Sequence, residues 1–238
     1  MDIGTRRHFM PRESFDRELH NLQDEVLLLG SMVEQALISS VDSLRTRDLE
    51  EAHRIYLNDQ IINEKRYAIE NAILVLIATQ QPMAHDLRIL AAILEVITEL
   101  ERMGDYAKGI AKVNRLIGEF TFSMPIREIT RMVELGVSML HRALSAFIAE
   151  DSATARTIPL EDDLVDDLYI RVYKTLINQM IAEPQTIDHA NYLIWVAHNL
   201  ERTADRVTNI CERTVFIATG ELMEFDVDDE EDEGSSEE

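Results

Sequence analysis

Apolar residues recur at alternating steps of four and three along most of the chain. The first segment carries the series Phe15, Leu19, Leu22, Val26, Leu29, Val33, Ala36 and Ser40. This heptad-like spacing is typical of a helix that packs in an antiparallel bundle. No segment alternates apolar and polar residues over a sustained length, so we predict an all-α fold without a sheet.

Turn residues divide the pattern into six long helices, which we place at about 14–46, 48–79, 82–118, 126–150, 152–182 and 186–220. Asp48 and Glu51 match a capping box at the second start, and Pro82 is well placed to open the third helix. We expect Pro159 to kink or split the fifth helix. Gly220 is a natural stop for the sixth.

The second half of the chain repeats the plan of the first. We therefore predict two tandem three-helix bundles related by a pseudo-twofold, at residues 12–120 and 124–220, with the boundary at 119–125. The segment 221–238 contains 11 Asp or Glu residues and no Lys or Arg. Such a block repels itself and buries little apolar surface, so we predict a disordered acidic tail.

Charge narrows the possible functions. The net charge is −22, and half of this excess lies in the tail, which leaves 34 acidic against 23 basic residues elsewhere. An acidic surface disfavours direct binding to nucleic acid or to anionic lipid. The longest apolar run, at 72–78, is too short to cross a bilayer. We expect a cytoplasmic protein that reaches a membrane only through partners, and the single cysteine, Cys211, fits a reducing compartment.

A short acidic phrase occurs twice, 100 residues apart: Leu100-Glu101-Arg102-Met103-Gly104-Asp105 returns as Leu200-Glu201-Arg202-Thr203-Ala204-Asp205. Glu and Asp stand four residues apart in each copy, so both carboxylates lie on one side of a helix, one turn from each other. At 100° per residue they fall on the flank of the buried stripe. Like charges at this spacing repel, and a cation or polar partner would offset that cost.

A second repeated step lies on the preceding helix of each half. Asp59 with Asn63 in the first half corresponds to Asp162 with Asp166 in the second. The candidate metal ligands are therefore Asp59, Glu101 and Asp105 in the first half, and Asp162, Asp166, Glu201 and Asp205 in the second. Oxygen ligands suit hard cations such as Mg²⁺, Ca²⁺, Mn²⁺ or Fe³⁺. Solvated helix faces, or contacts of a metal-free interaction scaffold, explain the same acids without a metal.

Other chemistries find less support. A ferritin-like di-iron site needs two Glu-x-x-His motifs, and the chain offers only Glu50 with His53. There is no Gly-rich phosphate loop, nucleophile elbow or catalytic triad order. We therefore expect no enzymatic activity. A metal-dependent hydrolase or redox enzyme is the third alternative, and it would need an open coordination position.

Several phrases resemble the PhoU family of bacterial phosphate-signalling regulators. They are the two Leu-Glu-Arg-x-x-Asp copies, Gln81-Pro82-Met83-Ala84-His85-Asp86-Leu87-Arg88, and Met32-Val33-Glu34-Gln35. The resemblance covers about residues 12–220, in order and with matching helix lengths. The chain departs from the family pattern at Gly109 and Asn209, where a third carboxylate would extend each acidic series.

The resemblance implies a cytoplasmic, non-enzymatic adaptor and a homodimer. It implies two partners, the ATPase subunit of the phosphate ABC transporter and the phosphate-sensing histidine kinase. With them, members restrain phosphate uptake and repress starvation genes. It also implies metal of the iron, zinc or manganese class, bound through the Glu/Asp-x-x-x-Asp repeats at Glu101/Asp105 and Glu201/Asp205 with their neighbours on the adjacent helices.

Overall fold

The structure, a computed structural model, describes residues 11–118 and 123–225, and within these ranges it contains helices and no strand. The long helices are α1 (Pro11–Thr46), α2 (Leu49–Gln80), α3 (His85–Ile117), α4 (Ile126–Ala149), α6 (Asp162–Ala182) and α7 (Ile187–Thr219). The short elements are α5 (Ser152–Ala155) and the 3₁₀ turns η1 (Pro159–Glu161) and η2 (Pro184–Thr186). The all-α prediction of six long helices is confirmed.

Local signals fix some of the helix ends. The Glu51 amide donates to Asp48 Oδ1 at 2.9 Å, as expected for the N-cap of α2. The region around Pro159 interrupts the predicted fifth helix, since α5 ends at Ala155 and α6 begins at Asp162. The prediction that Pro82 opens the third helix was wrong. Gln81 and Ala84 both have positive φ, so the chain turns across 81–84 and α3 begins at His85.

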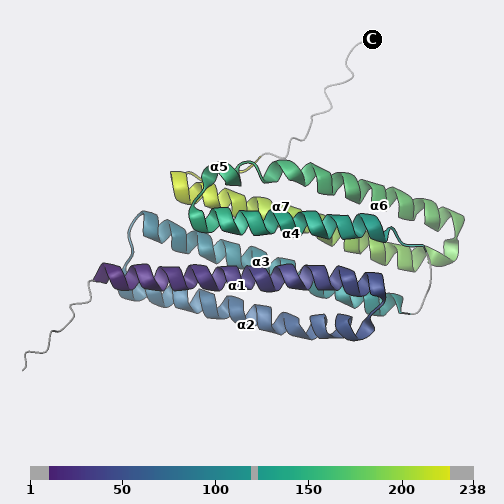
Figure 1. The fold of residues 1–238 in the computed structure, drawn as a ribbon, viewed down its shortest axis with the longest axis horizontal. Coiled ribbons are helices and arrows are strands. Elements are labelled where there is room, and N and C mark those ends of the chain that lie inside the picture. The colour runs from purple at the N-terminus through teal and green to yellow at the C-terminus, as the bar shows by residue number, and fades with distance from the viewer. Residues whose placement is uncertain (1–10, 119–122, 226–238) are drawn as a thin grey trace, which may run out of the picture.

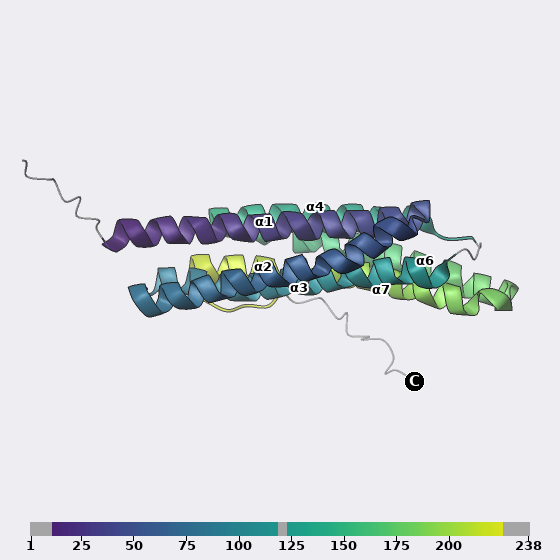
Figure 2. The same cartoon turned by 90° about the horizontal axis from the view of Figure 1, so that it is seen from below.

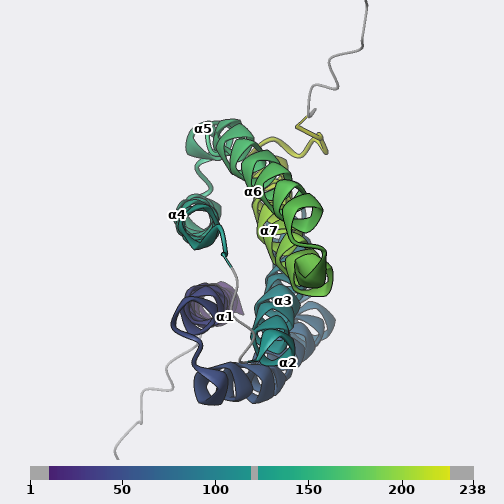
Figure 3. The ribbon, with the colours of Figure 1, turned by 90° about the vertical axis from the view of Figure 1, so that its right-hand side faces the viewer.

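The helices form two layers (Figures 1 and 2). In the end view of Figure 3, α2, α3, α7 and α6 follow one another in an arc, and α1 and α4 lie against its concave side. The central pair, α3 and α7, is antiparallel, because Glu99 of α3 pairs with Arg206 of α7 while Gly109 lies against Trp195. The first half is thus related to the second across the α3–α7 contact.

One continuous core joins the halves. Buried apolar side chains from α1 to α7 form a single cluster. Gly30 lets α1 approach α4 closely, because a Cβ atom there would lie 2.2 Å from Leu144 Cδ1. The two three-helix bundles are therefore packed against each other through their cores rather than joined only by the 118–123 connection.

Two of these helices, α1 and α4, are long and apolar enough by composition to cross a membrane. Their buried seams account for this property, because core helices of a folded protein pass the same test. Residues 221–225, which the sequence assigned to the tail, lie against α7: the Phe225 amide donates to Glu212 Oε1 at 3.0 Å. The remaining tail residues, 226–238, and the 119–122 part of the predicted boundary lie outside the described residues.

Candidate cation site

The repeated acids occupy equivalent positions on the two central helices. Glu101 and Glu201 are half-buried, and Asp105 and Asp205 are more exposed. The apolar or small residues between and beside them are buried in both copies, namely Leu100, Met103, Gly104 and Ala107 in α3 and Leu200, Thr203, Ala204 and Val207 in α7. The structure therefore places all four acids on the flank of the buried stripe, as the spacing predicted.

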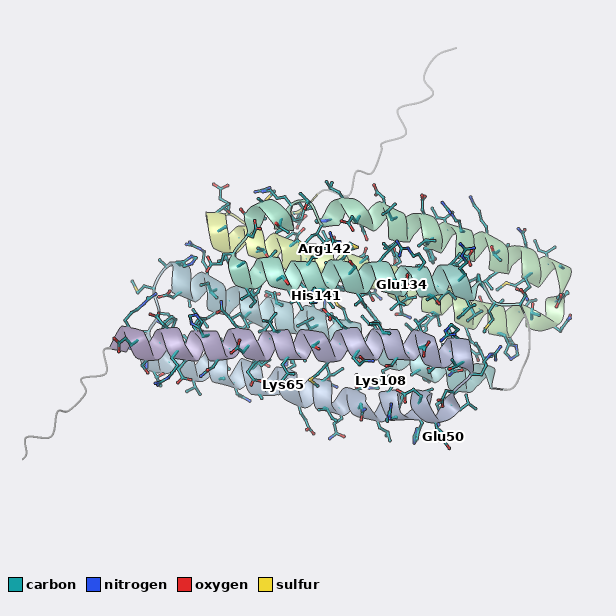
Figure 4. All side chains as sticks on the ribbon, viewed as in Figure 1. Glu50, Lys65, Lys108, Glu134, His141 and Arg142 are labelled. Atoms are coloured by element: carbon teal, nitrogen blue, oxygen red, sulfur yellow. The ribbon has the colours of Figure 1, made fainter. Side chains whose placement is uncertain are left out.

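In the first half, a lysine stands among the acids. Asp59 of α2 is only 4% exposed. Its Oδ2 accepts hydrogen bonds from Lys108 Nζ at 2.6 Å and from Asn63 Nδ2 at 3.2 Å. Lys108 Nζ also lies 3.8 Å from Asp105 Oδ1. Figure 4 shows Lys108 within the half built by α1, α2 and α3.

Positive charge also reaches Glu101. Burial raises the pKa of Glu101, followed by repulsion from Asp105, while the nearby Arg66 guanidinium lowers it. Burial likewise raises the pKa of Asp105, and Lys108 opposes that shift. The first acidic cluster is thus partly neutralised by side chains of the protein itself.

In the second half, four carboxylates repel one another. Burial, and next repulsion from Asp166, Asp205 and Glu201, raises the pKa of Asp162 to about 7. Burial, and next repulsion from Asp205 and Asp166, raises the pKa of Glu201 to about 7. The pKa values of Asp166 and Asp205 are also raised, mainly by burial.

Two oxygens in this second cluster lack hydrogen bonds. Asp162 Oδ1 and Glu201 Oε2 are buried and have no hydrogen-bond partner in the described chain. His198 Nδ1 lies 3.1 Å from Glu201 Oε2, outside hydrogen-bonding geometry. Unpartnered buried carboxylate oxygens are costly, so this cluster is suited to a positively charged ligand.

The second cluster opens into a groove that the sequence reasoning did not find. Asp162, Asp205 and Thr208 line it together with further acids from three segments, Glu95, Glu99, Glu212 and Glu224. Some of these are already engaged, since Arg206 Nη1 donates to Glu99 Oε2 at 3.2 Å. Glu95 and Glu99 belong to the first half, and only the packing of α3 against α7 brings them to this groove. Their four-residue spacing, the same as in the repeated phrase, was the available signal.

The two clusters differ in how well they fit a metal ion. As the side chains lie, no three His, Cys, Asp or Glu residues within 11–118 and 123–225 are gathered closely enough to hold one ion. The donors of the second cluster are nevertheless carboxylate oxygens, which hard cations prefer, and two of them lack partners. In the first cluster, the ammonium of Lys108 already occupies Asp59 Oδ2. The first cluster also has two buried oxygens without hydrogen-bond partners, Asp59 Oδ1 and Asn63 Oδ1. The second cluster fits a cation better than the first, because Lys108 already holds one oxygen of the first.

Two other residues singled out by the sequence have structural roles. A side chain at Gly109 would meet the Trp195 ring, because its Cβ would lie 2.3 Å from Cη2, so no carboxylate fits there. Cys211 is buried, and burial raises the pKa of its thiol to about 12, which keeps it protonated and unreactive.

Comparisons with known proteins agree with this architecture. The family model described as the PhoU domain matches twice, at residues 26–113 and 129–214. The phosphate-specific transport system accessory protein PhoU homolog of Clostridium acetobutylicum is 35% identical, over 91% of this chain and 99% of that protein. The homolog from Streptococcus pneumoniae is also 35% identical, over 90% and 99%.

Solved structures give the same result. The phosphate transport system regulatory protein PhoU from Streptococcus pneumoniae superposes with a TM-score of 0.83 at 34% identity, over 89% of this chain and 100% of that one. PhoU from Pseudomonas aeruginosa superposes with a TM-score of 0.82 at 27% identity, over 87% and 100%. With the family model covering both halves, the chain belongs to the PhoU family.

Proposed function

We propose that this protein is a cytoplasmic negative regulator of phosphate uptake and of phosphate-starvation signalling. It acts as a non-enzymatic adaptor between the ATPase subunit of a phosphate ABC transporter and a phosphate-sensing histidine kinase. The names of its relatives, accessory proteins of phosphate-specific transport systems, support the link to the transporter. It functions as a homodimer, binds no nucleic acid and reaches the membrane through its partners.

Regulation by contact needs surfaces that proteins recognise. The two outer helices of the arc expose large apolar side chains, Tyr56, Leu57, Ile61, Tyr67, Leu74 and Val75 on α2, and Leu164, Ile170, Tyr173 and Ile181 on α6. Gathered apolar side chains on a folded protein favour protein contact over simple solvation. These helix faces therefore support an adaptor role.

We further propose that Asp162, Asp166, Glu201 and Asp205 hold a metal ion of the iron, zinc or manganese class; Mg²⁺ and Ca²⁺ fit the same oxygen ligands. The observation that carries this proposal is the pair of buried, unpartnered oxygens, Asp162 Oδ1 and Glu201 Oε2. A bound cation supplies positive charge and no reaction step. It would relieve the repulsion between α6 and α7 and so fix their relative position.

The metal and adaptor parts are tested together in the full-length, tag-free protein from phosphate-fed and phosphate-starved cells. The variant Asp162→Asn/Asp166→Asn/Glu201→Gln/Asp205→Asn keeps the side-chain shapes and removes the charges. We expect it to lose metal in elemental analysis and to derepress starvation genes. The matched control is Asp163→Asn/Asp167→Asn, which changes two exposed acids of the same helix α6. This control should keep both properties.

Each outcome selects one alternative. If wild-type protein contains only background metal and still co-purifies with the transporter ATPase, the protein is a metal-free scaffold. Metal without co-purification of transporter or kinase would refute the adaptor. Metal-dependent phosphatase or oxidase turnover that the four-residue variant loses would replace the proposal with an enzyme.

A further inference from the structure

The two halves carry different residues at the positions that reach into their acidic clusters. The central helices align at an offset of 100 residues, as Glu101 with Glu201 and Asp105 with Asp205. At this offset Lys108 corresponds to Thr208, and both are half-buried. A cation in the first half is therefore replaced by a neutral hydroxyl in the second.

Lys108 makes the contacts that a bound cation would make. Its Nζ donates to the buried carboxylate of Asp59 and lies near that of Asp105, and it stands 5.6 Å from the centre of the Tyr56 ring. The Oδ1 atoms of Asp59 and of its counterpart Asp162 are both buried without a hydrogen-bond partner. The difference is at the second oxygen, because a lysine donates to Asp59 Oδ2 and the residue at the corresponding position near Asp162 is Thr208.

A second substitution acts in the same direction. The flanking helices align at an offset of 103 residues, as Asp59 with Asp162, so Arg66 corresponds to Tyr169. Arg66 donates to Glu70 Oε2 at 2.7 Å, and its charge opposes the rise in the pKa of Glu101 that burial and Asp105 cause. Tyr169 has no positive charge to offer, and burial, followed by the neighbouring Glu201 carboxylate, raises the pKa of its hydroxyl.

The flanking amide also differs, because Asn63 corresponds to Asp166. The first half thus has one cation, Lys108, that contacts its carboxylates directly, and the corresponding position of the second half has none. Arginines near the second cluster make their direct contacts elsewhere: Arg206 contacts Glu99 and the Tyr106 hydroxyl, and Arg202 lies over the Tyr106 ring. Their charges still oppose the burial-raised pKa of Asp205, but neither donates to a carboxylate of the cluster as Lys108 does.

We propose that Lys108 is a built-in cation that takes the place of a metal ion in the first half, so that the chain binds metal only through its second half. Metal binding through the second half rests on the proposed metal function. The role of Lys108 as a built-in cation does not. The reason is steric as well as electrostatic, because the ammonium lies against Asp59 Oδ2, beside the place that a metal ion bound to this carboxylate would take.

A reciprocal exchange tests this. The probe is Mn²⁺ alone, added to metal-stripped full-length protein, with bound and free Mn²⁺ separated by equilibrium dialysis. In wild type we expect one class of sites, which Asp162→Asn removes and Asp59→Asn leaves intact. Lys108→Thr should add at least one equivalent of bound Mn²⁺, and adding Asp59→Asn should remove that gain. Thr208→Lys should weaken Mn²⁺ binding at least tenfold.

Matched controls separate charge from general disturbance. Lys112 is exposed one turn further along α3, so Lys112→Thr removes the same charge outside the cluster and should leave the stoichiometry unchanged. Thr208→Val removes the hydroxyl without adding a charge and should retain binding. Circular dichroism establishes that each variant is folded.

The results distinguish the two proposals. Two equivalent Mn²⁺ classes in wild type, or no gain in Lys108→Thr, would overturn the assignment of Lys108. Wild type that takes up no Mn²⁺ would overturn metal binding in the second half, and with it the metal part of the proposed function. In that case the counter-ion role is decided by urea unfolding: Lys108→Thr must have a lower midpoint than Lys112→Thr, and equal midpoints would refute it.

Discussion

The two halves of the molecule share their backbone signals and differ in their site chemistry. Arg47 and Glu150 both have positive φ, 59° and 53°, and each is followed by an aspartate that caps the next helix. Asp48 accepts from the Glu51 amide, and Asp151 accepts from the Ala153 and Thr154 amides. The same turn therefore begins the second helix of each half. The charges between α2 and α3 and between α6 and α7 are nevertheless unlike, so equal folds here do not mean equal sites.

The largest expected effect of this difference is on stability: substitutions of Asp59 and of Asp162 should change the free energy of unfolding in opposite directions. Removing Asp59 breaks a buried ion pair and leaves Lys108, one third exposed, without its nearest partner. We expect Asp59→Ala to lower the free energy of unfolding by about 2 kcal/mol, below the usual cost of breaking a buried pair because Lys108 reaches solvent. In EDTA at pH 8, Asp162→Asn should instead raise stability, by less than about 1 kcal/mol, because it removes a repelled charge.

Urea unfolding of both variants measures this contrast. Asp59→Asn should also lower the free energy of unfolding, as Asp59→Ala does. Because asparagine keeps the volume of the side chain, this variant separates the loss of charge from the loss of volume. Destabilisation of similar size by Asp59→Asn and Asp162→Asn would show that the two acidic clusters are electrostatically alike, against the difference described above.

A smaller effect is expected where the halves meet. Gly109 lies under the Trp195 ring, and an alanine methyl group there would overlap it. Trp195 is 43% exposed, so the ring has room to turn outward. We expect Gly109→Ala to cost about 1–2 kcal/mol through overpacking and to shift the fluorescence of this single tryptophan to longer wavelength.

The equivalent position in the second half provides the control. Asn209 lines the acidic groove, away from the Trp195 ring that covers Gly109. Asn209→Ala should leave both the stability and the tryptophan emission close to wild type. An unshifted emission maximum in Gly109→Ala would mean that the ring does not depend on glycine at this position.

Much of this architecture follows from the sequence, because periodic apolar residues and local caps are short-range signals. They were sufficient for six helices, for the split near Pro159 and for the flank position of the repeated acids. The start of α3 was missed, because the turn at 81–84 uses positive φ at Gln81 and Ala84, residues that give no sign of it. Glu95 and Glu99 were missed at the second site, because only the α3–α7 contact brings them to it.

The pairing of Lys108 with Asp59 could not be predicted from the sequence. Lys108 belongs to the same helix as the first acidic phrase, but its pairing with Asp59 depends on how α2 packs against α3. Spacing predicted that carboxylates would gather and could not predict which cation would meet them. The sequence therefore assigned equal roles to both clusters, and three-dimensional packing separates them.

The smallest expected effect is a pH dependence that arises mainly in the second half. The folded state raises the pKa of Asp162 from 3.8, and that of Glu201 from 4.5, to about 7 in each case. The folded chain therefore binds more protons than the unfolded chain between about pH 4.5 and 7, and stability falls as the pH rises through this window. In EDTA, the melting temperature should be higher at pH 6 than at pH 8, by less than about 3 °C.

Paired substitutions localise this dependence. Asp162→Asn/Glu201→Gln should flatten the profile between pH 6 and 8, whereas Glu101→Gln/Asp105→Asn should change it less, since Lys108 and Arg66 oppose the shifts in the first half. Saturating Mn²⁺ should also flatten the wild-type profile, because a bound cation keeps the second cluster ionised at both pH values. Equal flattening by the two double variants would mean that the built-in cations do not distinguish the halves in solution.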